Sequence, residues 1–199
     1  MKLHLPTLAL AAAATHAQTA PVVPASKAGE VGKIALGYAD SGDFDGFRLG
    51  VSAGLVNDLF LHASFADISG PTKLGTDQDF RAYNFGLGYR LPFGAGKATL
   101  GAAIGSLDSD ADALNGDQFQ LRAGYALEIA KGLEAELSLT HTFNDMDEAG
   151  VDDLTAPALT LRYVVGNGLG IELSASSKDT LSNTDTGDGS WSLSAVYAF

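Results

Sequence analysis

Apolar residues recur at every second position from Lys33 to the last residue, Phe199. Successive side chains of a β-strand point to opposite faces, so a period of two predicts strands, whereas the apolar face of a helix repeats about every 3.6 residues. The pattern returns in about ten segments of about 8 to 12 residues, a length that fits tilted strands crossing a bilayer. The apolar faces comprise Ile34, Leu36, Tyr38; Phe47, Leu49, Val51, Ala53, Leu55; Leu59, Leu61, Ala63, Phe65; Tyr83, Phe85, Leu87, Tyr89, Leu91; Ala98, Leu100, Ala102, Ile104; Phe119, Leu121, Ala123, Tyr125, Leu127, Ile129; Leu133, Ala135, Leu137, Leu139; Leu159, Leu161, Tyr163, Val165; Leu169, Ile171, Leu173, Ala175; and Trp191, Leu193, Ala195, Tyr197, Phe199.

Short and long connections alternate between these segments, as expected for a membrane barrel with short periplasmic turns and longer external loops. Three of the short turns are consistent with this assignment of faces. In each, three residues separate two apolar residues that would lie opposite each other in the hairpin and so point to the same face. Such turns favour a left-handed backbone at their last position, which suits Asp58, Gly132 and Gly168. Short turns are expected at 56–58, 92–96, 130–132 and 166–168, and longer loops near 40, 68–78, 108–116, 144–154 and 179–188. The matched pairs are Leu55 with Leu59, Ile129 with Leu133, and Val165 with Leu169.

Backbone polar groups inside a bilayer must be paired within the protein, so strands can span it only as a closed barrel, and single-chain bacterial barrels have even strand numbers. Residues 31–199 are therefore predicted to form an all-β fold, a closed antiparallel up-and-down transmembrane barrel of about ten strands. Eight strands remain the alternative if the first hairpin, from Ile34 to Leu55, is misread. Aromatic residues are expected to form two interfacial girdles: Tyr38, Phe47, Phe65, Tyr83, Phe119, Phe143 and Trp191 at the loop ends, and Tyr89, Tyr197 and Phe199 at the turn ends.

The N-terminal segment has the pattern of an export signal. A short basic start precedes an apolar stretch, Leu3 to Ala14, and small residues follow up to Ala17. This pattern predicts a signal peptide over residues 1–20, cleaved after Ala17 or Ala20, followed by a short periplasmic lead-in at 21–30.

Composition excludes several classes of protein. The chain has no cysteine, so disulfides and thiolate metal sites are ruled out. Its formal net charge of -12, with only 12 Lys and Arg residues, argues against a nucleic-acid partner, because such partners are bound by neutralising phosphates. No cofactor is expected.

The last nine residues, Trp191 to Phe199, alternate and end in phenylalanine with an aromatic residue two positions earlier. They resemble the terminal assembly signal of bacterial outer-membrane barrels. This resemblance implies an outer-membrane location and recognition by the barrel-insertion machinery through Tyr197 and Phe199. The segment from Asp43 to Ser52, leading into 57–61, is similar to hairpins of small outer-membrane barrel families, including one once linked to quorum signalling.

Charged residues occupy the opposite parity, on the face that would line the barrel. Arg162 is expected across from Glu172 and near Glu136, which predicts an interior ion-pair network. The network either neutralises charge in a filled lumen or lines a water path that selects ions. Eight-stranded barrels are filled by side chains, so a wide pore is not expected. The predicted lumen network is Arg48, Arg90, Arg122, Glu128, Glu134, Glu136, Arg162 and Glu172, and His62, Asn84, Gln118, Gln120 and Lys178 share its face.

Most acidic residues fall in the expected external loops. They are either solvated loop residues or a site for divalent cations that bridge to outer-membrane lipids and lipopolysaccharide. The run Asp108-x-Asp110-x-Asp112 is not an EF-hand, since Ala113 and Phe119 stand at the glycine and glutamate positions. No defined metal site is predicted. The acidic residues are Asp40, Asp43, Asp45, Asp67, Asp77, Asp79, Asp108, Asp110, Asp112, Asp117, Asp145, Asp147, Glu148, Asp152, Asp153, Asp179, Asp185 and Asp188.

No catalytic centre is predicted. His62 with Ser64, and His141 near Asp145, are the only candidate pairs, and a serine nucleophile needs both a base and an orienting acid. His62-Ala63-Ser64 is similar to lipid A deacylases in two residues only.

Three functions follow from this reading. The first is a non-enzymatic structural or interaction barrel, with a role in envelope integrity or adhesion. The alternative is a narrow porin-like channel for ions or small solutes, and a lipid A-modifying enzyme comes third. The sequence leaves the oligomeric state open.

Overall fold

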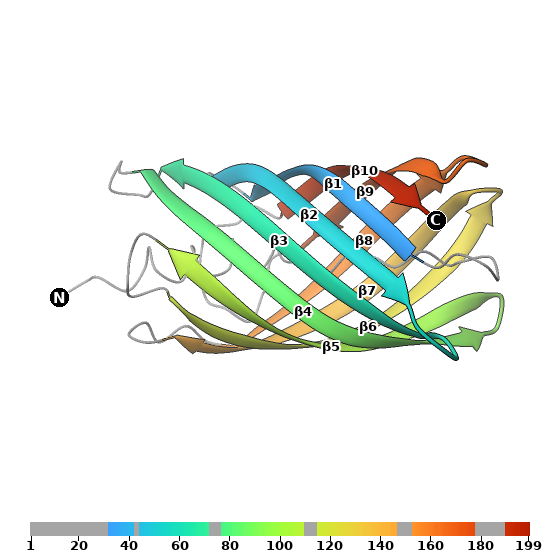
Figure 1. Ribbon diagram of the computed structural model, residues 1–199, viewed down its shortest axis with the longest axis horizontal. Coiled ribbons are helices and arrows are strands. Elements are labelled where there is room, and N and C mark those ends of the chain that lie inside the picture. The colour runs from blue at the N-terminus through green and yellow to red at the C-terminus, as the bar shows by residue number, and fades with distance from the viewer. Residues whose placement is uncertain (1–31, 42–43, 72–76, 110–114, 147–152, 178–189) are drawn as a thin grey trace.

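The computed structural model describes residues 32–41, 44–71, 77–109, 115–146, 153–177 and 190–199, which form a closed antiparallel barrel of ten strands (Figure 1). Each strand pairs with its neighbours in sequence, and β1 also pairs with β10. No helix long and apolar enough to cross a membrane occurs among these residues. The strands are β1 (Gly32–Ser41), β2 (Phe44–Gly54), β3 (Leu59–Pro71), β4 (Asp77–Phe93), β5 (Gly96–Ser109), β6 (Gly116–Ala130), β7 (Leu133–Met146), β8 (Leu154–Val164), β9 (Leu169–Ser176) and β10 (Ser190–Ala198).

The prediction of ten strands is confirmed, and the eight-strand alternative is wrong. The hairpin in question forms β1 and β2, with Tyr38 opposite Phe47 and Leu36 opposite Leu49. Closure is completed between the two ends of the barrel sheet: Gly32 N donates to Phe199 O at 2.9 Å, and Phe199 N donates to Gly32 O at 3.0 Å. The closed barrel leaves no sheet edge to solvent or lipid, as a membrane-spanning sheet requires.

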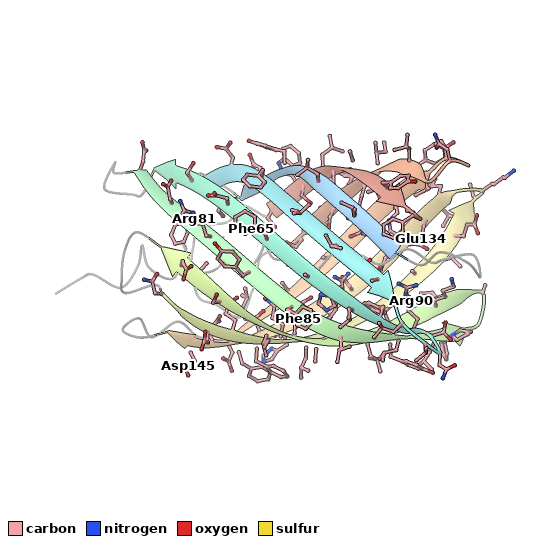
Figure 2. The ribbon with its side chains drawn as sticks, viewed as in Figure 1. Phe65, Arg81, Phe85, Arg90, Glu134 and Asp145 are labelled. Atoms are coloured by element: carbon pink, nitrogen blue, oxygen red, sulfur yellow. The ribbon has the colours of Figure 1, made fainter. Side chains whose placement is uncertain are left out.

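Side chains alternate between the two faces of the wall as the sequence predicts. Apolar side chains point outward and are exposed, including Phe85 at 55% and Leu137 at 64%, whereas their neighbours in the chain point inward. In water such a continuous apolar surface would be unfavourable, but it suits the acyl chains of a bilayer. Figure 2 shows Phe65 and Phe85 on the outer surface.

The short turns lie at the right-hand end in Figure 1, together with the C-terminus. Backbone angles confirm the left-handed positions: φ is 65° at Asp58, 76° at Gly132 and 85° at Gly168. The expected pairings Leu55 with Leu59 and Val165 with Leu169 are also confirmed, because in each pair the N–H of the first residue donates to the carbonyl of the second at 2.8 Å.

Three expectations about connections are wrong. A β-bulge shifts the register after Glu128, so Leu133 pairs with Ala130 and not with Ile129 as expected. The expected turn at 92–96 shrinks to two residues, because Phe93 pairs with Gly96 and φ of +59° at Gly94 permits a tight reversal. The expected loop near 40 is likewise short, since pairing continues to the last residue of β1, opposite the first of β2.

The aromatic residues gather at both ends of the wall, as predicted. At the loop end, ring centroids are 5.8 Å apart for Tyr38 and Trp191, and 5.0 Å apart for Phe65 and Tyr83. At the turn end, the rings of Tyr197 and Phe199 stack at 6.0 Å. These two girdles mark the levels at which the barrel meets the lipid headgroups.

Candidate functional site in the barrel lumen

A chain of buried ion pairs crosses the lumen near the turn end. Arg162 on β8 donates from Nε to Glu172 on β9 at 2.9 Å and from Nη1 to Glu134 on β7 at 2.8 Å. Lys33 on β1 donates from Nζ to the same Glu172 at 2.9 Å. All four residues are buried, and Lys33 has no exposed surface. We call Lys33, Glu172, Arg162 and Glu134 the inner charged belt.

A second pair lies on the neighbouring wall. Arg122 on β6 donates from Nη2 to Glu136 at 2.8 Å and to Ser138 at 3.2 Å, both on β7. Arg162 lies opposite Glu172 in the strand register, as expected. Glu136 lies near enough to Arg162 to interact through its charge, as expected, but it accepts its hydrogen bond from Arg122. Glu134 pairs with Arg162 because it is the direct register partner of that arginine.

Two further arginines extend into space that small residues leave. Arg48 on β2 donates to Ser192 on β10 at 2.9 Å, across Gly37, the β1 residue that is its register partner. The Arg90 guanidinium lies 4.7 Å from the centroid of the Phe60 ring, a cation–π geometry. That ring in turn occupies the space beside Gly88.

One predicted network residue lies elsewhere. Glu128 is exposed near the end of β6, where its carboxylate accepts a hydrogen bond from Gly132 N in the following turn at 3.0 Å. The β-bulge that follows Glu128 places it at the rim instead of in the buried network. Figure 2 shows Arg90 and Glu134 toward this turn end, and Arg81 and Asp145 toward the loop end.

Sequence reasoning missed Lys33, although face parity could have found it: Lys33 precedes the first outward residue, Ile34. With Lys33 included and Lys97 at the rim set aside, the buried and half-buried charges of the described lumen wall number five basic residues against three carboxylates. These are Lys33, Arg48, Arg90, Arg122 and Arg162, against Glu134, Glu136 and Glu172. Lys97 and Glu128 lie nearer the rim, one of each sign. The lumen is therefore net positive, although the whole chain carries a net charge of -12.

Neutral polar side chains line the middle of the lumen. Ser52, His62, Ser64, Asn84 and Gln118 are buried or half-buried, and each has at least one side-chain polar atom without a protein partner. Buried polar atoms of this kind are usually satisfied by water. They mark a zone suited to water.

Two voids adjoin the charged groups. A recess of about 680 Å³ at the turn end reaches Glu134 and Arg162 from the rim. A cavity of about 20 Å³, the size of one water molecule, is bordered by His62, Arg122 and Glu136. Both voids are bordered by charged side chains of the lumen wall.

Large apolar side chains face the lumen near the loop end, a feature that sequence reasoning did not single out. Ile68, Phe80, Leu107 and Leu154 have inward parity and exposed fractions of 0 to 5%. Polar side chains such as Gln118 on β6 and Ser190 on β10 face inward at the same end, and Phe60 and Val196 are buried apolar residues elsewhere in the interior.

The two histidines among the described residues lie in different surroundings. His62 Nδ1 and Ser64 Oγ both lack hydrogen-bond partners, and no described carboxylate forms an ion pair with His62. His141 has outward parity, and its Nδ1 lies 2.7 Å from Thr155 Oγ1.

The family of the chain follows from its sequence match. The model of a family described as Gram-negative porin matches residues 7–148 and 40–199. The chain belongs to the Gram-negative porin family. This porin is accordingly an outer-membrane β-barrel protein, as the strand pattern and the resemblance predicted.

Solved structures resemble the porin in fold. The NanC porin shares 12% identity at a TM-score of 0.52, with 84% of this chain and 99% of that chain covered. The KdgM porin shares 9% identity at a TM-score of 0.47, with coverage of 84% and 99%. The Yersinia pestis protein Ail shares 18% at 0.44, with coverage of 86% and 100%. No curated protein matches the porin in sequence.

The outer rim of the porin carries several of the predicted acidic residues on its outward face. Tyr38 donates to Asp45 at 2.9 Å, and Arg81 lies 3.7 Å from Asp67. The described residues hold no group of three or more potential metal ligands. Part of the prediction lies outside the described residues, namely Asp43, Asp110, Asp112, Asp147, Glu148, Asp152, Lys178, Asp179, Asp185 and Asp188.

Proposed function

We propose that this porin is a narrow, non-enzymatic channel that passes small ions across the outer membrane and prefers anions. The observation that carries the proposal is the excess of five basic residues over three carboxylates on the described lumen wall. Arg and Lys side chains that line a pore favour anions, because an anion exchanges its water shell for fixed positive charge. Membership of the porin family supports conduction.

The inner charged belt sets the size limit of the proposed channel. Arg162 and Glu172 are 2% and 3% exposed, so neighbouring side chains pack closely around them and a large solute would be excluded. The recess of about 680 Å³ brings water to Arg162 from the periplasmic rim. Beyond the belt, neutral polar groups such as Asn84 and Gln118 would solvate an ion without binding it tightly.

A non-enzymatic role fits both histidine environments. His62 Nδ1 has no hydrogen-bond partner and no described carboxylate pairs with His62, so it lacks the group that would orient it as a general base. His141 bonds to a threonine on the outward face. We assign both histidines structural roles in the wall, and this argues against the lipid A-modifying alternative.

A second candidate function is a structural or interaction barrel with an adhesive outer surface. The ion-paired interior favours it, because buried pairs such as Arg162 with Glu134 rigidify a wall whether or not ions pass. In this view the acidic outer rim, for example Asp45 and Asp67, binds lipopolysaccharide through divalent cations. Residues 1–20 serve as the export signal in either case, and Tyr197 and Phe199 serve as the contact for the insertion machinery.

Reconstitution of the folded barrel in planar bilayers tests the channel. We expect small, reproducible current steps, and lower anion preference in Arg48→Gln. The matched control is Arg81→Gln, since Arg81 lies on the outer face with its side chain 56% exposed and should leave selectivity unchanged. A folded barrel without current steps would favour the structural function.

A further inference from the structure

Along β3, β4 and β5, large side chains that face the lumen stand opposite glycines of the next strand. The pairs follow the strand register, and the three large side chains are only 4 to 6% exposed. A glycine inside a strand often marks a place where another group approaches closely. We call these the glycine-backed pairs: Phe60 with Gly88, His62 with Gly86, and Asn84 with Gly105.

The large side chain of each pair occupies the space that a Cβ on its partner would need. At Gly88 an added Cβ would overlap Cζ of Phe60, and at Gly86 it would lie 2.5 Å from Nε2 of the partner imidazole. At Gly105 it would lie 2.9 Å from Cγ of the partner amide. These separations are well below van der Waals contact, so each large side chain fits only because its partner has no side chain.

These contacts fix the direction in which the large side chains lie. Alternate residues of a strand point to the same face, so a Cβ on any of the three glycines would point into the lumen. A side chain that takes this position lies across the neighbouring strand, against the wall, instead of pointing at the barrel axis. Arg90 follows the same course, since its guanidinium lies 4.7 Å from the centroid of the Phe60 ring.

Another lumen glycine is not covered in this way. Gly101 on β5 is the register partner of Arg122 on β6, yet a Cβ at Gly101 would meet nothing closer than 3.4 Å. Arg122 instead reaches Glu136 on β7, and the cavity of about 20 Å³ borders both the glycine and the arginine. Gly101 therefore offers a matched comparison on the same face.

The pair of Phe60 and Gly88 lies at the same end of the lumen as the inner charged belt. Phe60 is the second residue of β3 and Glu134 the second of β7, and both strands begin after short turns. A ring pushed off Gly88 would enter the lumen near the part of the proposed channel that the belt narrows. It would also displace the Arg90 guanidinium, one of the five basic groups of the lumen wall.

We propose that the glycines of the glycine-backed pairs keep the lumen passable, because they let large side chains lie against the wall. This inference rests on the proposed channel function and deepens it by naming residues that set the width of the path for ions. If the pairs served folding alone, a folded variant would conduct as the wild type does.

Gly88→Ala tests this most cleanly, because the three atoms nearest to the added Cβ all belong to the Phe60 ring, whereas a backbone carbonyl also crowds the other two glycines. We expect single-channel conductance to fall about twofold or more in Gly88→Ala, since conduction depends on pore diameter. The double variant Phe60→Ala/Gly88→Ala lacks the displaced ring and should conduct at least as well as the wild type. Gly101→Ala is the control and should keep the wild-type value, and heat-dependent gel migration shows whether each variant is folded.

Phe60→Trp keeps the inference testable if Gly88→Ala does not fold, because a larger ring opposite the unchanged glycine should also lower conductance. If the wild type conducts and the folded Gly88→Ala variant conducts equally, the inference is wrong and the channel stands. A loss that the double variant does not restore would also overturn the inference, because the ring would not be its cause. A folded wild type without current steps would overturn both proposals.

Discussion

Nζ of Lys33 lies 2.9 Å from Oε2 of Glu172, although 139 residues separate them in the chain. Lys33 belongs to β1 and Glu172 to β9, so the ion pair reaches across β10, the strand that closes the barrel. The register partner of Glu172 on β10 is Ser194, whose small side chain leaves the lysine room to cross. The ion pair thereby links β1 to β9 across β10, beside the seam that the backbone hydrogen bonds between β1 and β10 close.

Loss of the Lys33 ammonium should destabilise this closure. In Lys33→Met, Glu172 keeps Arg162 but loses one charged hydrogen bond, for which we expect a cost of about 1.5 to 3 kcal/mol. Urea unfolding of the refolded barrel in detergent micelles measures this change in the free energy of unfolding. Lys131→Met, at an exposed turn position, should change the unfolding free energy by less than about 0.5 kcal/mol. Equal unfolding midpoints for the two variants would contradict the role of the pair.

Gly88 is required by the Phe60 ring. A Cβ at position 88 would overlap Cζ of Phe60, so Gly88→Ala must displace the ring and the Arg90 guanidinium above it. We expect a loss of about 1 to 3 kcal/mol in unfolding free energy. Gly101, the register partner of Gly88 on β5, is a matched control, because a Cβ there meets nothing closer than 3.4 Å. The explanation is wrong if Gly101→Ala lowers the unfolding free energy as much as Gly88→Ala does.

The turn between β8 and β9 offers a test of backbone conformation. Gly168 has φ of +85°, and a Cβ there would also press on the Ala198 carbonyl, so Gly168→Ala should lose about 1 to 2 kcal/mol or more. Gly166 in the same turn has open space around its Cβ position. Thermal unfolding of both alanine variants should show a lower midpoint only for position 168.

Phe199 packs on the closure of the barrel. A Cβ at Gly32 would lie 2.7 Å from Phe199 Cζ, so the ring covers the first residue of β1. We expect Phe199→Ala to reduce the amount of folded protein in outer-membrane fractions several-fold, while Phe93→Ala, an exposed aromatic at the same end, has little effect. Equal recovery of both variants would show that Phe199 is not an assembly signal.

The sequence alone predicts the barrel wall well, because period-two alternation and turn glycines are local properties. Asp58, Gly132 and Gly168 show this, since each lies in the left-handed conformation that its turn demands. The period-two pattern does not predict the bulge after Glu128, because one extra residue in a strand leaves the alternation before it unchanged.

The lumen is only partly readable from sequence. Parity identifies which side chains face inward, but the partners of Arg162 depend on register across three strands. Parity also places Phe80 and Leu107 inside. Their role could not be predicted because both lie at or beside the expected loops, and only the structure shows that β4 and β5 include them. Barrel closure, which brings Lys33 to Glu172, requires the three-dimensional structure.

The reversal potential in a salt gradient tests the central claim most directly. The folded wild-type porin is placed in a planar bilayer with a tenfold gradient of potassium chloride, and the voltage at zero current is measured. A net positive lumen predicts a reversal potential with the sign of the chloride equilibrium potential. A reversal potential on the potassium side would contradict the account, and so would the absence of any current from folded protein.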